Sequence, residues 1–456
     1  MPDQPVATAP SAAQVPATPA RAGRRGWSWE TWVFAAALVC GAALILYAGR
    51  RLGFYYDEWQ YVQFRRGGDL DTYLDPHNGH LSLIPVAIYK ALFATIGIDH
   101  YWPYRVVLLA VHLTTCVLLY VLVRRRLGDR AALIAGLLLV IMATSSENLI
   151  WAFQLDFVAS VAAGLGAFAL LDRPSRRNDL WACALIVVSL ACSSLGVPFL
   201  LGVAVELLLQ PQRRRQLWIV AIPGALFGLW LLGYGASGQL LRENLGLTTQ
   251  YVADAATAAA ACIVGLPGWG QALLVGGAAA VAILRRANPL APPPSPRLAA
   301  FVVTILTFWT LTALSRGQLH EPGAPRYLYI GAVMLMLIAA WLLPRPRAWS
   351  GWATATVAVL LAFVLLGNGY RLRDSERFFR AIWEPLRGSL AAFEVAGAAA
   401  DPAAAPIVPA WPNLTAGPYL AAVRDNGSPT GGATWLARAY ESQRLTADAQ
   451  LVQVED

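Results

Sequence analysis

Charged residues are scarce in this sequence. Only 14% of its 456 residues are Asp, Glu, Lys or Arg, whereas 57% are hydrophobic, and the mean hydropathy is +0.50. Soluble domains carry roughly 25% charged residues. The composition therefore excludes an ordinary soluble domain and predicts an integral membrane protein.

Cysteine is also rare, and its spacing excludes two kinds of site. The sequence has 5 cysteines, all within apolar stretches and none in a CxxC pattern: Cys40, Cys116, Cys183, Cys192 and Cys262. Neither a disulfide framework nor a thiolate metal centre fits this pattern. We interpret these residues as small hydrophobic core residues.

Positive charge is in excess, with a formal net charge of +8. The arginines occur in short clusters between apolar runs rather than in one patch, so they do not indicate a nucleic-acid surface. Basic clusters between membrane spans determine orientation, because they remain in the cytoplasm. Nucleic acid is therefore not an expected partner.

The apolar runs predict an all-α polytopic membrane protein. Residues 1–26, rich in Ala and Pro, should be a disordered cytoplasmic tail, followed by a transmembrane module at 27–367 and an extracytoplasmic C-terminal region at 368–456. The expected spans are 32–49, 104–123, 131–145, 155–171, 180–194, 195–209, 217–235, 268–284, 298–314, 327–343 and 349–367.

These spans place every arginine cluster on one side of the membrane. The arrangement has about eleven transmembrane helices, a cytoplasmic N-terminus and an extracytoplasmic C-terminus in the plasma membrane. The segment 180–209 is the open point: it fits either a hairpin of two short helices or one long tilted span. The second alternative would reverse everything downstream.

The longest outer loop, residues 50–101, begins with an unusual acid pair. Asp57 and Glu58 lie in FYYDEWQYV, just beyond the first span. Two carboxylates at a membrane surface can serve as a general base and its support if burial tunes one of them. The alternative is that Asp57 caps a short helix at 58–66 while Glu58 remains solvated.

The same loop continues with DPHNGHLSLIP, in which His77 and His80 are three residues apart. Asp69, Asp71 and Asp75 lie nearby. A metal site is one interpretation, but the pattern is loose and its composition is typical of a turn. The DxD at 69–71 also matches the metal-binding motif of nucleotide-sugar transferases. We discount this match because no nucleotide sugar is available on the outer face of the membrane. We predict no metal ligands.

Two arginines open spans on the outer face, where the positive-inside rule makes them unexpected. Arg105 lies in DHYWPYRVV and Arg326 in PRYLYIG, followed by Tyr327. A guanidinium at this depth can bind a lipid phosphate. Ordinary snorkelling to the interface is the alternative for each.

Together these motifs resemble the GT-C membrane glycosyltransferases. The resemblance rests on a first span followed by YxDExxY (Tyr55, Asp57, Glu58, Tyr61), a His-containing turn, and an Arg opening the second span. It covers residues 32 to about 196 and resumes at PRYLY. The branch that it resembles holds the protein O-mannosyltransferases and the lipid A aminoarabinose transferases.

The resemblance implies a membrane enzyme that transfers a sugar from a polyprenyl-phosphate donor to an extracytoplasmic hydroxyl, usually with inversion. Asp57 would be the general base with Glu58 beside it, and Arg326 would hold the donor phosphate with Arg105 as a second contact. The residues implied in substrate binding are Tyr61, His77, His80, Glu147 and Tyr327.

Some implications of the resemblance stay open. The branch usually has His-Pro-Pro where this chain has Asn78 and Gly79 after His77, so the roles of the two histidines are unsettled. Glu147 could instead cap a helix, and Asp156 is a weaker candidate of the same kind. No nucleotide or redox cofactor is expected, and a divalent cation is left open because some members of the superfamily use one.

Two other functions remain as alternatives: a transporter or flippase of lipid-linked sugars, and a non-catalytic membrane scaffold. A transporter would place ionisable residues at mid-depth in repeated, broken helices. This sequence keeps its carboxylates mostly in loops and has no obvious repeat, which favours the enzyme. The acceptor could be a glycan, a glycolipid or a protein.

Overall fold

The computed structural model describes residues 28–235, 240–288, 294–345, 350–408 and 413–455. In these ranges every regular element is a helix, apart from one isolated β-bridge between His77 and His80. The expected disordered tail at 1–26 lies outside the described residues, as do residues 346–349, which include the start of the last expected span.

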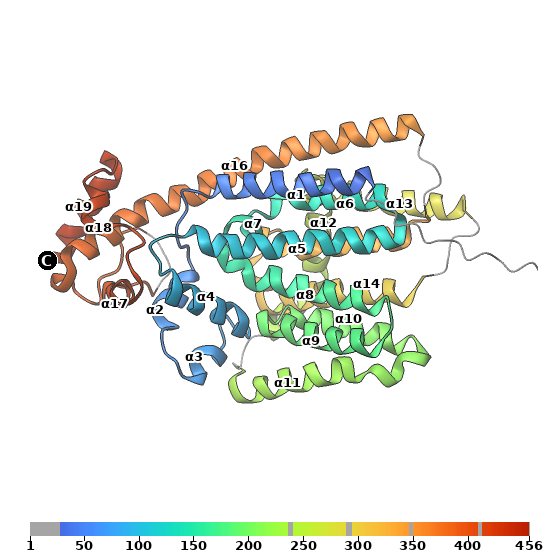
Figure 1. The fold of residues 1–456 in the computed structure, drawn as a ribbon, viewed down its shortest axis with the longest axis horizontal. Helices are drawn as coiled ribbons and strands as arrows, with labels where there is room; N and C mark the ends of the chain where they lie inside the picture. Colours follow the sequence, from blue (N-terminus) through green and yellow to red (C-terminus); the bar gives the residue numbers. More distant parts are fainter. Residues whose placement is uncertain (1–27, 236–239, 289–293, 346–349, 409–412, 456) are drawn as a thin grey trace, which may run out of the picture.

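Long helices lie roughly parallel and form a bundle (Figure 1). They are α1 (Trp29–Ala48), α5 (Trp102–Leu127), α6 (Asp129–Val140), α8 (Leu155–Leu171), α9 (Arg176–Cys192), α10 (Gly196–Leu208), α11 (Trp218–Tyr234), α13 (Gly270–Arg286), α14 (Pro296–Arg316), α15 (Pro325–Leu342) and α16 (Gly351–Ala396). The other helices lie in the connections and in the C-terminal region. They are α2 (Glu58–Phe64), α3 (Leu70–Leu74), α4 (Leu83–Thr95), η1 (Ala143–Ser145), α7 (Glu147–Ile150), η2 (Ala152–Gln154), η3 (Pro211–Gln216), η4 (Arg242–Leu247), α12 (Thr248–Val264), η5 (Gly317–Leu319), η6 (Gly397–Ala399), α17 (Ala416–Asn426), α18 (Gly432–Leu436) and α19 (Glu441–Glu455).

Six helical segments in the described part of the chain are long and apolar enough to cross a membrane. They are Trp29–Ala48, Trp102–Leu127, Ala152–Leu171, Pro296–Leu319, Pro325–Leu342 and Gly351–Ala399. Five of them have 18 to 26 residues, close to the roughly 20 that a bilayer requires, and Gly351–Ala399, with 49, is much longer. The protein is therefore an integral membrane protein with a polytopic helical fold, as its composition predicts.

One end of the bundle, here named the arginine end, gathers the basic clusters. Arg126 donates to the carbonyls of Trp341 and Leu343, and Arg285 donates to the carbonyl of Leu342. Arg125 pairs with Asp172, 3.0 Å away. These contacts join the ends of four helices, α5, α8, α13 and α15, so residues that are far apart in sequence meet in space.

The segment 180–209 forms two helices, α9 and α10, which is the first of the two alternatives that the sequence left open. The chain reverses at residues 193–195. Gly196 permits this tight turn, because a Cβ there would lie 2.5 Å from the backbone nitrogen of Leu190. Only glycine allows such a close backbone approach.

The opposite end, here named the loop end, holds the first loop and the C-terminal region (Figure 1). An aromatic core joins them: the rings of Trp59 and Trp383 stack with centroids 6.5 Å apart, and Tyr419 meets Trp59 at 5.8 Å. The boundary expected between residues 367 and 368 falls inside α16, which continues without a break to Ala396. The C-terminal region thus packs directly on the loop that carries Asp57.

The third outer loop, expected at 236–265, contains the 17-residue helix α12. Its start follows η4, where Asn244 donates to the carbonyl of Leu314 near the end of α14. Its end, Gly265, accepts a hydrogen bond from Arg371 of α16. Both ends of α12 therefore lie toward the loop end, and the helix packs against α14 and α15.

Candidate functional site

Asp57 lies in the wall of a cavity at the loop end. The cavity has a volume of about 490 Å³ and is lined by Tyr55, Tyr56, Asp57, His77, Asn78, His80, Glu147, Trp151, Phe153, Gln154, Asp156, Phe157, Arg316, Leu319, Arg326, Tyr327 and Asn413. These residues come from the first loop, α7, α8, the α14–α15 connection and the C-terminal region. We name this space the acid cavity.

The backbone before Asp57 is strained. Tyr56 has φ +43°, the left-handed region that bulky residues rarely adopt. Asp57 occupies the position before α2, but its carboxylate makes no capping hydrogen bond to that helix. Strain of this kind is often found at functional sites, and here it directs the Asp57 carboxylate away from the helix and into the cavity.

The environment of Asp57 suits a base. Burial raises the pKa of its carboxyl above the ordinary value of 3.8, while a hydrogen bond from Asn78 and the charges of Arg316 and Arg326 act in the opposite direction. A partly desolvated carboxylate is a better proton acceptor than one in water. The Asp57 carboxylate is therefore a partly buried proton acceptor that faces a polar cavity.

Glu58 faces the other way and does not line the acid cavity. Its side chain is fully buried, where it accepts hydrogen bonds from Tyr89 Oη (2.6 Å), Tyr101 Oη (3.0 Å) and the backbone nitrogen of Tyr55 (2.8 Å). Burial raises the pKa of this carboxyl to about 8. Adjacent residues at the start of a helix point in different directions, so the two acids are separated.

The turn at residues 77–80 is a tight hairpin. His77 and His80 exchange backbone hydrogen bonds of 3.0 and 2.8 Å, and Asn78 and Gly79 both have positive φ, +49° and +81°. Asn-Gly is the preferred pair for such a turn. Burial lowers the pKa of His77 to about 3 and that of His80 to about 4, so both imidazoles are neutral. Both line the acid cavity.

Arg326 and Glu147 form an ion pair across the acid cavity. Arg326 Nη1 lies 3.4 Å from Glu147 Oε2, and Nη2 lies 3.5 Å from Glu321 Oε2. Burial raises the pKa of Glu147, and the charge of Arg326 opposes that shift. Glu147 opens α7, so the pair joins α7 to the start of α15.

Arg316, at the end of α14, is a site residue that the sequence analysis did not identify. It lines the acid cavity and also a second, largely apolar cavity of about 560 Å³, which we name the apolar cavity. The two cavities share His80, Phe157, Arg316 and Tyr327. Arg316 forms no ion pair with another described residue. The positive-inside argument that singled out Arg105 and Arg326 applies equally to Arg316 and could have found it.

Asp156 is buried in the wall of the acid cavity at the start of α8. One carboxylate oxygen accepts a hydrogen bond from the backbone nitrogen of Phe157 at 2.6 Å. The first turn of a helix is a favourable place for a carboxylate. Asp156 therefore joins Asp57 and Glu147 as a third acid of this cavity.

Besides Glu58, two expected site residues do not line the acid cavity. Arg105 is buried and donates to the carbonyls of Ile45 (2.6 Å), Leu46 (3.3 Å) and Ile150 (3.1 Å), which ties α1 to α7. Tyr61 is buried behind the turn, with its ring 5.0 Å from that of His77. Tyr327, by contrast, lines both cavities.

The described residues contain no group of three or more His, Cys, Asp or Glu that could hold a metal ion. The DxD acids have local roles: Asp69 accepts a hydrogen bond from the Thr72 backbone nitrogen at the start of α3, and Asp71 accepts one from Tyr234 at 3.1 Å. Neither lines the acid cavity.

Comparisons with known proteins bear on the fold. No family model and no curated protein matches the sequence. Among solved structures, the chain is similar to ArnT from Cupriavidus metallidurans in the apo state, with a TM-score of 0.55 and 14% sequence identity over 86% of this chain and 85% of that chain. ArnT is a lipid A aminoarabinose transferase of the GT-C superfamily. The resemblance predicted from YxDExxY is confirmed at the level of the fold: this chain has the fold of the GT-C transferase ArnT.

Proposed function

We propose that this protein is a glycosyltransferase that uses a polyprenyl-phosphate sugar and has Asp57 as its general base. The observation that carries the proposal is the junction of the two cavities, where a polar space containing Asp57 adjoins an apolar space and Arg316 lines both. A lipid-linked sugar has the same division into a polar and an apolar part, with a phosphate between them.

The donor fits this junction in one direction. Its prenyl chain occupies the apolar cavity among Phe227, Leu231 and Phe308, and its phosphate meets Arg316. The sugar then lies in the acid cavity, on the side of Asp57. Arg326 takes part from the far wall, where Glu147 holds it in place.

The reaction follows from these positions. Asp57 accepts the proton of the acceptor hydroxyl, and the oxygen attacks the anomeric carbon as the bond from that carbon to the phosphate oxygen breaks. The bonding electrons leave with the phosphate, and the guanidinium of Arg316 stabilises the added negative charge in a site with little water. Attack opposite the leaving phosphate inverts the anomeric centre.

Other residues position the reacting groups. Neutral His80 lines both cavities and can donate a hydrogen bond to the donor, while Tyr327 flanks the phosphate position. Asp156 and His77 provide further polar contacts for the sugar or the acceptor. Glu58 anchors the strained segment from below through Tyr89 and Tyr101, so its role is to hold Asp57 in place.

We also infer the arrangement in the membrane. The bundle helices provide eleven crossings, with the arginine end in the cytoplasm and the loop end outside. In this arrangement residues 27–367 form the catalytic module, and 368–456 cover it on the extracytoplasmic side. Asn413, from that region, lines the acid cavity, which supports a contribution to the acceptor side. The acceptor is a hydroxyl of an extracytoplasmic glycan, glycolipid or protein.

The test is transfer of radiolabelled sugar from a panel of polyprenyl-phosphate sugars into membranes. Wild-type protein should transfer label from at least one donor, and Asp57→Asn should lower the rate by a factor of at least about 100, because a general base typically contributes that much. Asp69→Asn is the matched control, since Asp69 lies in the same loop outside the cavity.

Donor binding separates the two parts of the mechanism. Asp57→Asn should still bind the donor lipid, whereas Arg316→Gln should bind it about 10-fold or more weakly, because a charge-assisted contact is lost. Equal transfer by wild type and Asp57→Asn, or no transfer with any donor, would contradict the proposed function.

A further inference from the structure

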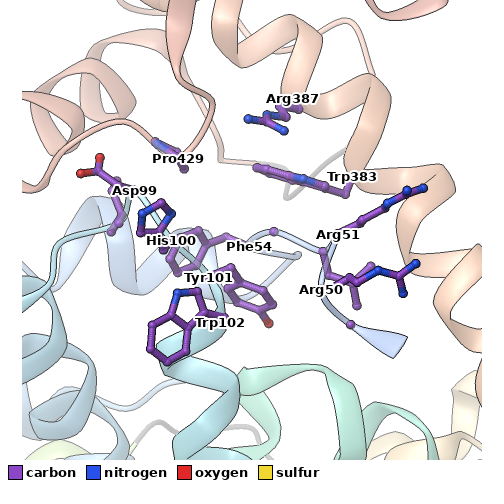
Figure 2. A pocket seen from close by; sticks show the side chains of 14 residues that line it. Arg50, Arg51, Phe54, Asp99, His100, Tyr101, Trp102, Trp383, Arg387 and Pro429 are labelled. Carbon is purple, nitrogen blue, oxygen red and sulfur yellow. The ribbon is translucent and has the colours of Figure 1, made fainter. Parts of the chain in front are cut away.

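A second polar pocket opens at the loop end, separate from the acid cavity. It has a volume of about 190 Å³, and its polar side chains come from three parts of the chain: Arg50 and Arg51 after α1, Asp99 and His100 before α5, and Arg387 in α16. Figure 2 shows Trp383 across the pocket with Arg387 above it, and Arg50 and Arg51 next to each other at the right-hand edge with their guanidinium groups pointing outward. The pocket shares no lining residue with the acid cavity.

The pocket carries a net positive charge. Its three arginines form no ion pair with a carboxylate of the described residues. Arg50 donates to the carbonyl of Tyr47 at 2.7 Å, and Arg387 donates to the carbonyl of Thr430 at 2.6 and 3.1 Å, so the hydrogen-bond partners of both are neutral carbonyl groups. Arg51 makes no hydrogen bond with another described residue and is exposed.

The acid of the pocket does not balance these charges. Asp99 already accepts a hydrogen bond from the backbone nitrogen of Ser428 at 2.5 Å. The pocket also includes Trp102, the first residue of the 26-residue helix α5, where unpaired backbone N–H groups add positive potential. Arg50 and Arg51 place two guanidinium groups next to each other at one edge of the pocket, an arrangement suited to an anion with several oxygen atoms.

The depth of the pocket places it among lipid headgroups. Arg50 and Arg51 follow directly on the end of α1 at Ala48, a helix long enough to cross the bilayer. Tyr47, whose ring lies 3.6 Å from the Arg50 guanidinium, and Trp102, which lines the pocket, have 62% and 59% of their surface exposed, which is typical of aromatic residues at the membrane interface. Below them, Leu44 and Val106 are exposed on α1 and α5, where lipid chains would lie.

We propose that this pocket binds the phosphate of an anionic phospholipid from the surrounding leaflet. The headgroup phosphate meets Arg50 and Arg51 at the edge of the pocket, Arg387 adds positive charge nearby, and the acyl chains remain outside along α1 and α5. The volume of 190 Å³ accommodates a phosphate and part of a headgroup but not a whole lipid. The inference does not depend on which sugar is transferred or on whether transfer occurs.

Binding at this position would support the first loop. Phe54 and Tyr101 form the wall of the pocket, and the Tyr101 hydroxyl donates to Glu58 on the other side. A lipid in the pocket therefore holds the segment that leads from α1 to Asp57. We expect the protein to retain this lipid through purification.

Native mass spectrometry of the purified protein in a neutral detergent tests the proposal. Phosphatidylglycerol should bind to wild type more tightly than phosphatidylcholine. Each surface arginine contributes about a fivefold gain in anionic-lipid affinity, so Arg50→Gln/Arg51→Gln should bind phosphatidylglycerol on the order of 25-fold more weakly. Arg377→Gln, on the exposed face of α16 and paired with Asp374, should bind it like wild type.

Three outcomes would overturn the proposal: equal phosphatidylglycerol affinity in wild type and the double variant, equal affinity of wild type for the two lipids, or thermal stabilisation by inorganic phosphate as large as that by phosphatidylglycerol. The last would indicate a free phosphate as the ligand. Arg50→Lys/Arg51→Lys keeps the charge and should retain most of the preference for phosphatidylglycerol over phosphatidylcholine. If the guanidinium groups had only a structural role, this variant would lose the preference.

Discussion

At the scale of single residues, two adjacent acids have different environments. The sequence predicts Asp57 and Glu58 as a pair, and the structure places Asp57 in the acid cavity and Glu58 in the aromatic core. The pair could be recognised from its position after the first span. The opposite orientations of the two side chains could not be predicted, because they depend on the left-handed conformation of Tyr56 and on contacts with Tyr89 and Tyr101, which are distant in sequence.

The buried Glu58 should make folding stability depend on pH. Burial raises the pKa of its carboxyl from 4.5 to about 8, so the folded protein binds more protons than the unfolded chain between these values. Stability should therefore fall as the pH rises through this window, by at most about 1.4 kcal/mol per pH unit. Glu58→Gln cannot titrate and should flatten the dependence.

Thermal unfolding in detergent between pH 5 and pH 8 measures this slope. The control is Glu384→Gln, because Glu384 is partly exposed on α16 and pairs with Arg380; its slope should match that of wild type. An unchanged slope in Glu58→Gln would show that Glu58 titrates near its ordinary value.

At the scale of elements, the hairpin at 77–80 and the paired helices α9 and α10 agree with the turn and span signals in the sequence. The continuation of α16 beyond residue 367 was not predicted, because the apolar run ends there and the following residues read as a polar tail. The signal was present: Leu372, Phe379, Trp383, Leu386 and Leu390 are all buried, and their spacing follows one face of a helix.

The contact between α16 and the first loop predicts the effect of one substitution. A Cβ on Gly53 would lie 2.2 Å from Cε2 of Trp383, so Gly53→Ala must displace the indole or the loop. Overpacking of this kind costs about 1 to 3 kcal/mol, which should appear as a lower unfolding temperature.

Gly68→Ala is the matched control for this prediction. Gly68 lies in the same loop, and a Cβ there would have nothing within 4 Å. Equal unfolding temperatures for the two variants would mean that α16 does not pack on Gly53 as described.

At the scale of the whole molecule, the fold could be predicted from the sequence. The set of residues that line the acid cavity could be predicted only in part. The apolar runs and YxDExxY led to the ArnT-like fold. Arg105 and Arg316 show why the site residues were harder to predict than the fold. Both arginines lie at helix termini at the loop end, but Arg105 is bound by backbone carbonyls, whereas Arg316 lines both cavities. Such differences arise from tertiary packing and leave no local pattern.

The orientation in the membrane is open to a direct test. A membrane-impermeant maleimide should label Arg424→Cys, in the exposed part of α17, in intact cells. Arg177→Cys, at the arginine end, should be labelled only after lysis. Both variants require Cys40→Ala, because Cys40 is the exposed native cysteine among the described residues. The opposite pattern would place Asp57 in the cytoplasm and exclude the proposed reaction.

Because α16 runs without a break from the bilayer to the C-terminal region, the tilt of this helix and the position of that region are coupled. At 46 residues α16 is about 69 Å long, more than twice the roughly 30 Å of hydrocarbon that its apolar half must cross. A thinner bilayer increases the tilt of a long helix. When a long helix tilts, the end outside the membrane is displaced more than the part within it. Membrane thickness would thus change the position of the C-terminal region relative to the acid cavity, which Asn413 of that region lines.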